Sequence, residues 1–146
     1  MTELQAESPA GPRVFANWCV MDHARPELIR MLHGWGLSDA ATGLSQAESL
    51  TAAKMAAQDA DDYVRRVIRF VPLRRDLQKA LRIFLAALAL AARGDAENAA
   101  VVCIGVFTNA AAALSWRRPW MRLNWAPHRA RIIAKARGEQ NAHMGP

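Results

Sequence analysis

The stretch AAVVCIGVFTNAAAALSW, residues 99–116, decides the fold expected for this chain because it runs for eighteen residues without a formal charge. Thr108, Asn109 and Ser115 are its only polar side chains, so a helix here has no polar face. A helix that is apolar on all sides lies at the centre of a domain or inside a membrane. Its length and its alanine flanks favour a helix over a buried strand.

A second apolar run, IFLAALALAA, occupies residues 83–92. In the link between the two runs, Gly94 suits the C-cap of the first helix and Asp95 suits the N-cap of the second. We therefore expect an antiparallel helical hairpin. The side chains expected to be buried in it are Leu81, Phe84, Leu88, Ile104, Phe107 and Leu114.

The length and composition indicate one folded domain. A chain of 146 residues can bury a core of its own, and a hydrophobic content of 52% argues against disorder. We expect an all-α, single-domain bundle of four to five helices around the buried antiparallel hairpin. Residues 13–138 form this helical domain, between a disordered N-terminal tail (1–12) and a flexible C-terminal tail (139–146).

The sequence Ser45-Gln-Ala-Glu48 matches a capping box and predicts a long helix over residues 46–70. Its apolar side chains recur in steps of three and four, which is the period of a packing seam inside the domain or with a second copy. The seam consists of Leu50, Ala53, Ala57, Ala60, Val64, Val67 and Val71. On the other face, the i,i+4 spacing predicts the ion pairs Asp61–Arg65 and Asp62–Arg66.

Prolines set the boundaries of the remaining helices, because proline favours the first helical turn and cannot continue a helix. We expect a short helix over residues 26–33, a longer one over 73–93 and a last one over 128–137. Residues 34–44 are rich in Gly, Ser and Thr and indicate a connection with about one helical turn. Residues 13–21 fit a short amphipathic helix or a strand.

The charge is divided unequally along the chain. The net charge is +6, but residues 1–62 carry −5 and residues 63–146 carry +11. A division of this size indicates an anionic partner for the C-terminal half, or attraction between the two halves.

The strongest functional candidate is the segment 116–137, which has seven basic side chains, three tryptophans and no acidic residue. Nucleic acids bind such segments because phosphates attract Arg and Lys while unstacked bases lie on indole rings. The alternative is that the tryptophans cap the end of the core and the arginines stay solvated.

A second basic cluster flanks Pro72 and consists of Arg65, Arg66, Arg69, Arg74, Arg75, Lys79 and Arg82. By itself it is typical of a solvated helix face. In an antiparallel hairpin, however, residues 74–82 return beside residues 110–120, so both clusters share one end of the molecule. The predicted nucleic-acid-binding residues are therefore Arg74, Arg75, Lys79, Arg117, Arg118, Trp120, Arg122, Trp125, Arg129 and Arg131.

Residues 39–54 resemble a helix-turn-helix only superficially. Ala40 and Ala41 lie too near the turn residue Gly43, and Ser49 stands where an apolar side chain is expected. The second helix would also be nearly neutral, which does not suit docking in a DNA groove.

No catalytic motif is evident, and we expect neither an enzyme nor a cofactor. Cys19, Asp22, His23 and His33 do not have the spacing of a metal site, so we expect a core cysteine with surface histidines and no bound metal. No nucleophile and base occur in a catalytic arrangement.

Two cysteines and no secretory signal favour a reducing, cytoplasmic location. Residues 99–116 just reach the length of a membrane span, but residues 83–92 would rise only about 15 Å of the roughly 30 Å required. The mean hydropathy is −0.06, so a membrane is not the expected partner.

The sequence therefore predicts a non-enzymatic nucleic-acid-binding protein whose partner is the phosphate backbone of DNA or RNA. A helical protein–protein interaction module, either an inhibitor or an assembly subunit that binds another protein or a second copy, is the first alternative. A membrane-associated helical protein is the second.

Overall fold

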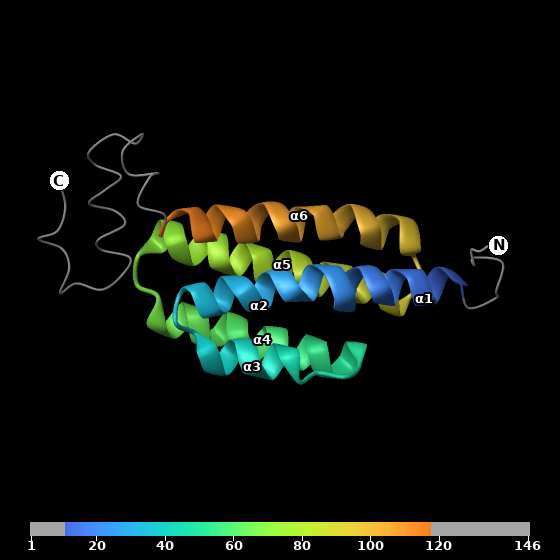
Figure 1. Ribbon diagram of the computed structural model, residues 1–146, viewed down its shortest axis with the longest axis horizontal. Coiled ribbons are helices and arrows are strands. Elements are labelled where there is room, and N and C mark those ends of the chain that lie inside the picture. Colours follow the sequence, from blue (N-terminus) through green and yellow to red (C-terminus); the bar gives the residue numbers. More distant parts are fainter. Residues whose placement is uncertain (1–10, 118–146) are drawn as a thin grey trace, which may run out of the picture.

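A computed structural model of the protein describes residues 11–117, and every regular element in that range is a helix. α1, the π-helical η1 and α2 follow one another without a break and form one rod, so the described chain packs as five rods (Figure 1). The expected all-α bundle is thereby confirmed. The elements are α1 (Gly11–Asn17), η1 (Trp18–Ala24), α2 (Arg25–Gly34), α3 (Ser38–Ser45), α4 (Leu50–Val67), α5 (Val71–Ala92) and α6 (Ala96–Ser115).

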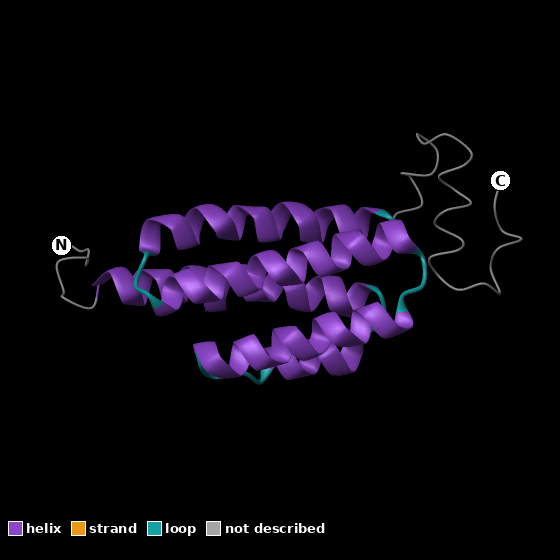
Figure 2. Ribbon diagram, turned by 180° about the vertical axis from the view of Figure 1, so that it is seen from behind, coloured by secondary structure: helices purple, strands orange, loops and turns teal. Residues whose placement is uncertain are grey.

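α5 lies at the centre of the bundle. It packs against α6 and α4, and it also contacts α1, η1 and α2. α6 runs along one edge of the bundle, while α3 and α4 form the opposite edge (Figures 1 and 2). α5 accordingly supplies much of the core, with buried Leu73, Leu77, Ala80, Leu81, Phe84, Ala87, Leu88 and Ala91.

The turn between α5 and α6 confirms the predicted hairpin. Gly94 has a φ of 76°, a left-handed conformation that glycine adopts without steric cost. The carboxylate of Asp95 accepts hydrogen bonds from the backbone N–H and the side-chain amide of Asn98, at 3.3 and 2.8 Å. These bonds, the side-chain one first, hold the pKa of Asp95 below its usual value, and the backbone bond caps one exposed N–H group at the start of α6.

The expectation that the last helix of the hairpin is buried on all sides is wrong. The buried face of α6 consists of Ala99, Cys103, Val106, Ala110 and Ala113. Ile104 is 60% exposed and Phe107 38% exposed, whereas Leu114 is half-buried beside Gly34. Because α6 lies at the edge of the bundle, its neighbours cover one side only. The hairpin is therefore a buried α5 paired with a half-exposed α6.

The long helix begins four residues later than the capping box predicts. Ser49 is the N-cap of α4, with extended backbone and a side-chain oxygen that accepts a 3.0 Å hydrogen bond from the backbone N–H of Ala52. Ser45 is instead the last residue of α3, and its hydroxyl donates to the carbonyl oxygen of Thr42 at 3.1 Å. The predicted Ser45 cap is thus wrong, and the helix ends at Val67 rather than at residue 70.

A tertiary contact explains why the capping box fails. The guanidinium of Arg25 donates to the carbonyl oxygens of Leu44, at 3.0 Å, and Ala47. The Leu44 carbonyl lies in the last turn of α3 and the Ala47 carbonyl in the segment that joins α3 to α4, and both residues are buried. The hydrogen bonds from Arg25 therefore stabilise a non-helical link between α3 and α4, at the place where the local sequence favours a helix.

The middle of the predicted seam is confirmed as an internal contact. Ala53, Ala57, Ala60 and Val64 are buried inside the bundle, on the side of α4 that packs against its neighbours. The ends differ, since Leu50 is half-buried and the valines at positions 67 and 71 are about two-fifths exposed. The buried centre leaves no room for a second copy at this seam.

The other predicted boundaries are met in part. The helices predicted over 26–33 and 73–93 correspond to α2 and α5, each shifted by one or two residues. Residues 34–44 contain more helix than predicted, because α3 occupies most of that segment. Residues 13–21 are helical, as the first of the two alternatives stated. The last predicted helix, 128–137, lies outside the described residues.

Candidate functional site

The predicted basic surface lies at the end of the bundle where α6 finishes and α5 begins. α5 starts after Phe70, whose extended backbone separates it from α4. Pro72 lies in the first turn of α5. The C-terminal ends of α2, α4 and α6 lie at this same end (Figure 1). We call this region the basic end.

Two tryptophans fix α6 to its neighbours at the basic end. The indole N–H of Trp116 donates to the Oδ2 atom of Asp76 on α5 at 2.9 Å, and its ring meets Phe70 edge-on, with ring centroids 5.9 Å apart. The indole N–H of Trp35 donates to the carbonyl oxygen of Ala113 at 3.0 Å. For Trp116, the alternative that the tryptophan caps the core is therefore confirmed.

The cations at the basic end come from α5 and from the residues that follow α6. Arg75 and Lys79 are exposed, and Arg74 is half-buried. Arg117 is exposed, and its guanidinium carbon lies 5.5 Å from the ring centroid of Trp35, in a cation–π contact. The Trp116–Asp76 hydrogen bond confirms that the antiparallel hairpin brings the start of α5 beside the end of α6.

A shallow surface groove of about 540 Å³ follows the exposed side of α5. It contains three cations, of which Arg82 is paired with Asp61 of α4, and one carboxylate, Asp76, which accepts a hydrogen bond from Trp116. Arg75 and Lys79 thus supply the positive charge of the groove. Its lining residues are Arg75, Asp76, Gln78, Lys79, Arg82, Ile83 and Ala86.

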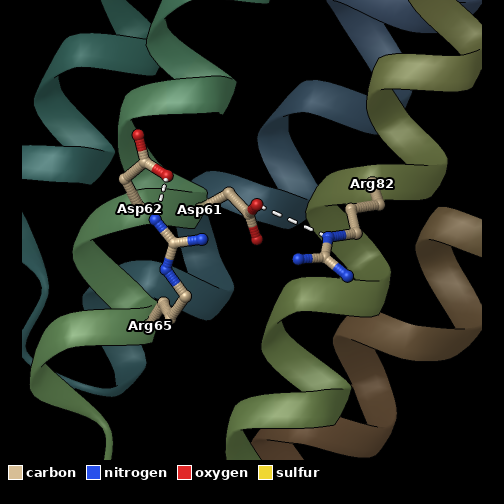
Figure 3. Close-up of polar contacts among 4 residues, drawn as sticks. All are labelled: Asp61, Asp62, Arg65 and Arg82. Atoms are coloured by element: carbon tan, nitrogen blue, oxygen red, sulfur yellow. Dashed lines mark hydrogen bonds and ion pairs between the residues drawn. The ribbon is translucent and has the colours of Figure 1, made fainter.

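The predicted i,i+4 ion pairs are replaced by other pairs (Figure 3). Asp62 binds Arg65 at 2.9 Å, an i,i+3 spacing, whereas Asp61 reaches across to Arg82 on α5 at 3.4 Å. Arg66 instead lies over the ring of Tyr63, 5.7 Å from its centroid. Asp61 faces α5 because the neighbouring seam residues turn this side of α4 towards the bundle, which local spacing cannot indicate.

Two buried polar atoms beside the groove have no hydrogen-bond partner within residues 11–117. They are Oδ1 of Asp61 and Nε2 of Gln78. The first is an acceptor, the other carboxylate oxygen of the residue that pairs with Arg82, and the second is a donor on α5, four residues before Arg82. Because unpaired buried polar groups are costly, water or a ligand group in the groove would gain by binding them.

The histidines and cysteines do not form a site in the described part of the chain, where no three metal-ligating side chains gather. The His23 ring instead packs edge-on against the Trp18 ring, with the ring centroids 3.9 Å apart. Burial raises the pKa of the Cys19 thiol, and burial together with the nearby Cys19 raises the pKa of Cys103 to about 11. Both thiols are therefore protonated at neutral pH and poor nucleophiles.

Sequence reasoning missed three residues of the basic end: Trp35, Phe70 and Asp76. Trp35 follows the helix-ending Gly34, and Phe70 precedes the break at Pro72. Large aromatic side chains at helix junctions are a signal for packing at a bundle end, and they could have been recognised. Of the predicted site residues, Arg118, Trp120, Arg122, Trp125, Arg129 and Arg131 lie outside the described residues.

Comparisons with protein-family models, with curated proteins and with solved structures find no match to this chain. Function must therefore be inferred from the residues themselves.

Proposed function

We propose that the protein binds nucleic acid through the phosphate backbone, using the basic end and the acid-free segment that continues from it. The observation that carries this proposal is the Trp116–Asp76 hydrogen bond, because it brings the start of α5, with Arg74, Arg75 and Lys79, to the end of α6 where the chain continues into residues 118–138. That segment holds further arginines and the tryptophans at positions 120 and 125, and it has no acid.

The chemistry favours backbone contact over base-specific recognition. Exposed cations neutralise phosphates and release counterions, whatever the sequence of the bases. The tryptophans at positions 120 and 125 would add sequence-tolerant stacking on single strands. Trp116 does not contribute to stacking in this proposal, because its ring packs against Phe70 and its N–H binds Asp76.

An electrophoretic shift titration with single-stranded and duplex DNA and RNA, at two salt concentrations, tests the proposal. We expect binding at low salt that weakens strongly at the higher concentration. Trp125→Ala should weaken single-strand binding by ~1–3 kcal/mol and duplex binding hardly at all. The absence of any shift at low salt would refute the proposal.

A protein-interaction role is the second candidate, favoured by the exposed apolar face of α6. α6 is also the one helix among the described residues that is long and apolar enough to cross a membrane, with 28% of its most apolar window buried. Flotation with uncharged (zwitterionic) vesicles distinguishes the membrane alternative, since a protein that binds phosphates only through its basic end stays at the bottom of the gradient.

A further inference from the structure

The outer face of α6 carries an uncharged strip that no described element covers. Val101 and Ile104 are each 60% exposed and Phe107 is 38% exposed, although all three are large and apolar. Thr108 and Ala111 continue the strip as exposed small side chains. We call these five residues the α6 strip. A contiguous exposed apolar surface of this kind is a candidate binding site.

We propose that the α6 strip is the contact surface for a second copy of this chain, paired in antiparallel orientation. The side chains at positions 97, 101, 104, 108, 111 and 115 follow steps of four and three, which is the spacing of a helix seam that meets another helix. The seam predicted on α4 has the same spacing, but it is already filled inside the bundle. The α6 strip, by contrast, is covered by no element within residues 11–117.

The distribution of side-chain size selects the antiparallel orientation. The strip is large over its N-terminal part and middle (Val101, Ile104, Phe107) and small at its C-terminal end (Thr108, Ala111). A two-fold axis midway between Ile104 and Thr108 sets Ile104 opposite Thr108 and Val101 opposite Ala111, with Phe107 beside the axis, so large and small side chains interlock. A parallel pair would oppose large to large and small to small, which leaves gaps and costs contact.

Charge favours the same orientation. Glu97 is exposed at the N-terminal end of α6, and Arg117 is exposed just after its C-terminal end. An antiparallel partner brings its negative end near the positive end of the first copy, and it also aligns opposite helix dipoles. A parallel partner would bring like charges together at both ends.

The size of the strip sets the strength of the pairing. α6 has 20 residues, so the contact is about 30 Å long, and a helix face is roughly 10 Å wide. The contact area, about 300 Å² per copy, is well below the ~800 Å² that each partner buries in a standard stable interface. The dimer is therefore weak, and the dimeric share of the protein increases with its total concentration. A lipid surface is a poorer occupant, because the small half of the strip offers little apolar area for insertion.

Sedimentation of the full chain over a wide concentration range tests the proposal. We expect monomer at low micromolar concentration and an increasing share of dimer at hundreds of micromolar. Ile104→Glu, and independently Val101→Lys, should abolish the dimer. The matched control is Met55→Glu, because Met55 is 61% exposed on α4 and lies outside the strip. Circular dichroism verifies that each variant keeps its helical fold.

Crosslinking tests the orientation. When Val101→Cys and Ala111→Cys proteins are mixed, the antiparallel pair predicts a mixed disulfide in excess of either homodimer. A preference for Val101→Cys homodimers would overturn the antiparallel arrangement. A wild-type chain that stays monomeric throughout, a dimer that survives both strip substitutions, or a monomer that floats with vesicles through the strip would overturn the proposal.

Discussion

Phe84→Ala and Phe107→Ala distinguish the observed packing from the one that composition alone suggests. Phe84 is fully buried on the central helix α5, whereas Phe107 keeps 38% of its surface in water on α6. Truncating a large side chain in a packed core removes its transfer free energy and leaves a cavity, at a cost of ~3–5 kcal/mol. At position 107 the side chain borders solvent, so no enclosed cavity forms.

The expected loss at position 107 follows from the exposed fraction. Full burial of a Phe side chain contributes ~1.5–3 kcal/mol, and about three-fifths of Phe107 is buried, so its truncation should cost about 1–2 kcal/mol. Urea unfolding followed by circular dichroism measures both values, at a concentration low enough to keep the chain monomeric, and an unchanged m-value makes them comparable. Equal losses, or a larger loss for Phe107→Ala, would refute the placement of α6 at the edge of the bundle.

Two further predictions concern the helix start and the buried thiol. Ser49→Ala should lower the free energy of unfolding by ~1 kcal/mol, while Ser45→Ala should change it by less than about 0.5 kcal/mol, and the reverse order in urea unfolding would contradict the assigned cap. Because the pKa of Cys103 is raised from 9.0 to about 11 in the folded state, its contribution to stability is intact below about pH 9 and is lost as the pH rises through 11. Between pH 9 and 11 the melting temperature of Cys103→Ala should therefore fall less than that of the wild type. An identical fall in both proteins would show that Cys103 does not titrate as described.

Local signals in the sequence sufficed for much of the fold. Gly94 and Asp95 predicted the α5–α6 turn because the required backbone conformation and cap depend on adjacent residues only. The three-and-four spacing of Ala53, Ala57 and Ala60 predicted a buried seam, since periodicity reports which face a helix turns inward.

The errors arose where distant residues decide the outcome. The start of α4 depends on Arg25, which lies about twenty positions away and donates to one carbonyl oxygen at the end of α3 and one in the α3–α4 link. The exposure of α6 depends on how many helices surround it, and an alanine-rich apolar helix has the same composition at the centre or at the edge.

The candidate site was predictable in its position and only partly in its contacts. Antiparallel geometry placed the α5 cations near the end of α6, and the Trp116–Asp76 hydrogen bond agrees with that placement. The partner of Asp61 was predicted wrongly as Arg65, because a helical spacing rule ignores Arg82 on the neighbouring helix.

The salt dependence of nucleic-acid affinity, measured by fluorescence anisotropy with a labelled single strand, tests the central proposal most directly. If about five phosphates are neutralised on this single strand, log affinity should fall with log salt at a slope of roughly −3.5. The double variant Arg75→Ala/Lys79→Ala should make this slope shallower by the contribution of about two phosphate contacts. The matched control Lys54→Ala/Arg93→Ala removes the same charges at exposed positions outside the basic end and should leave the slope near the wild-type value. Equal slopes for the two double variants would contradict a phosphate-binding role for the basic end.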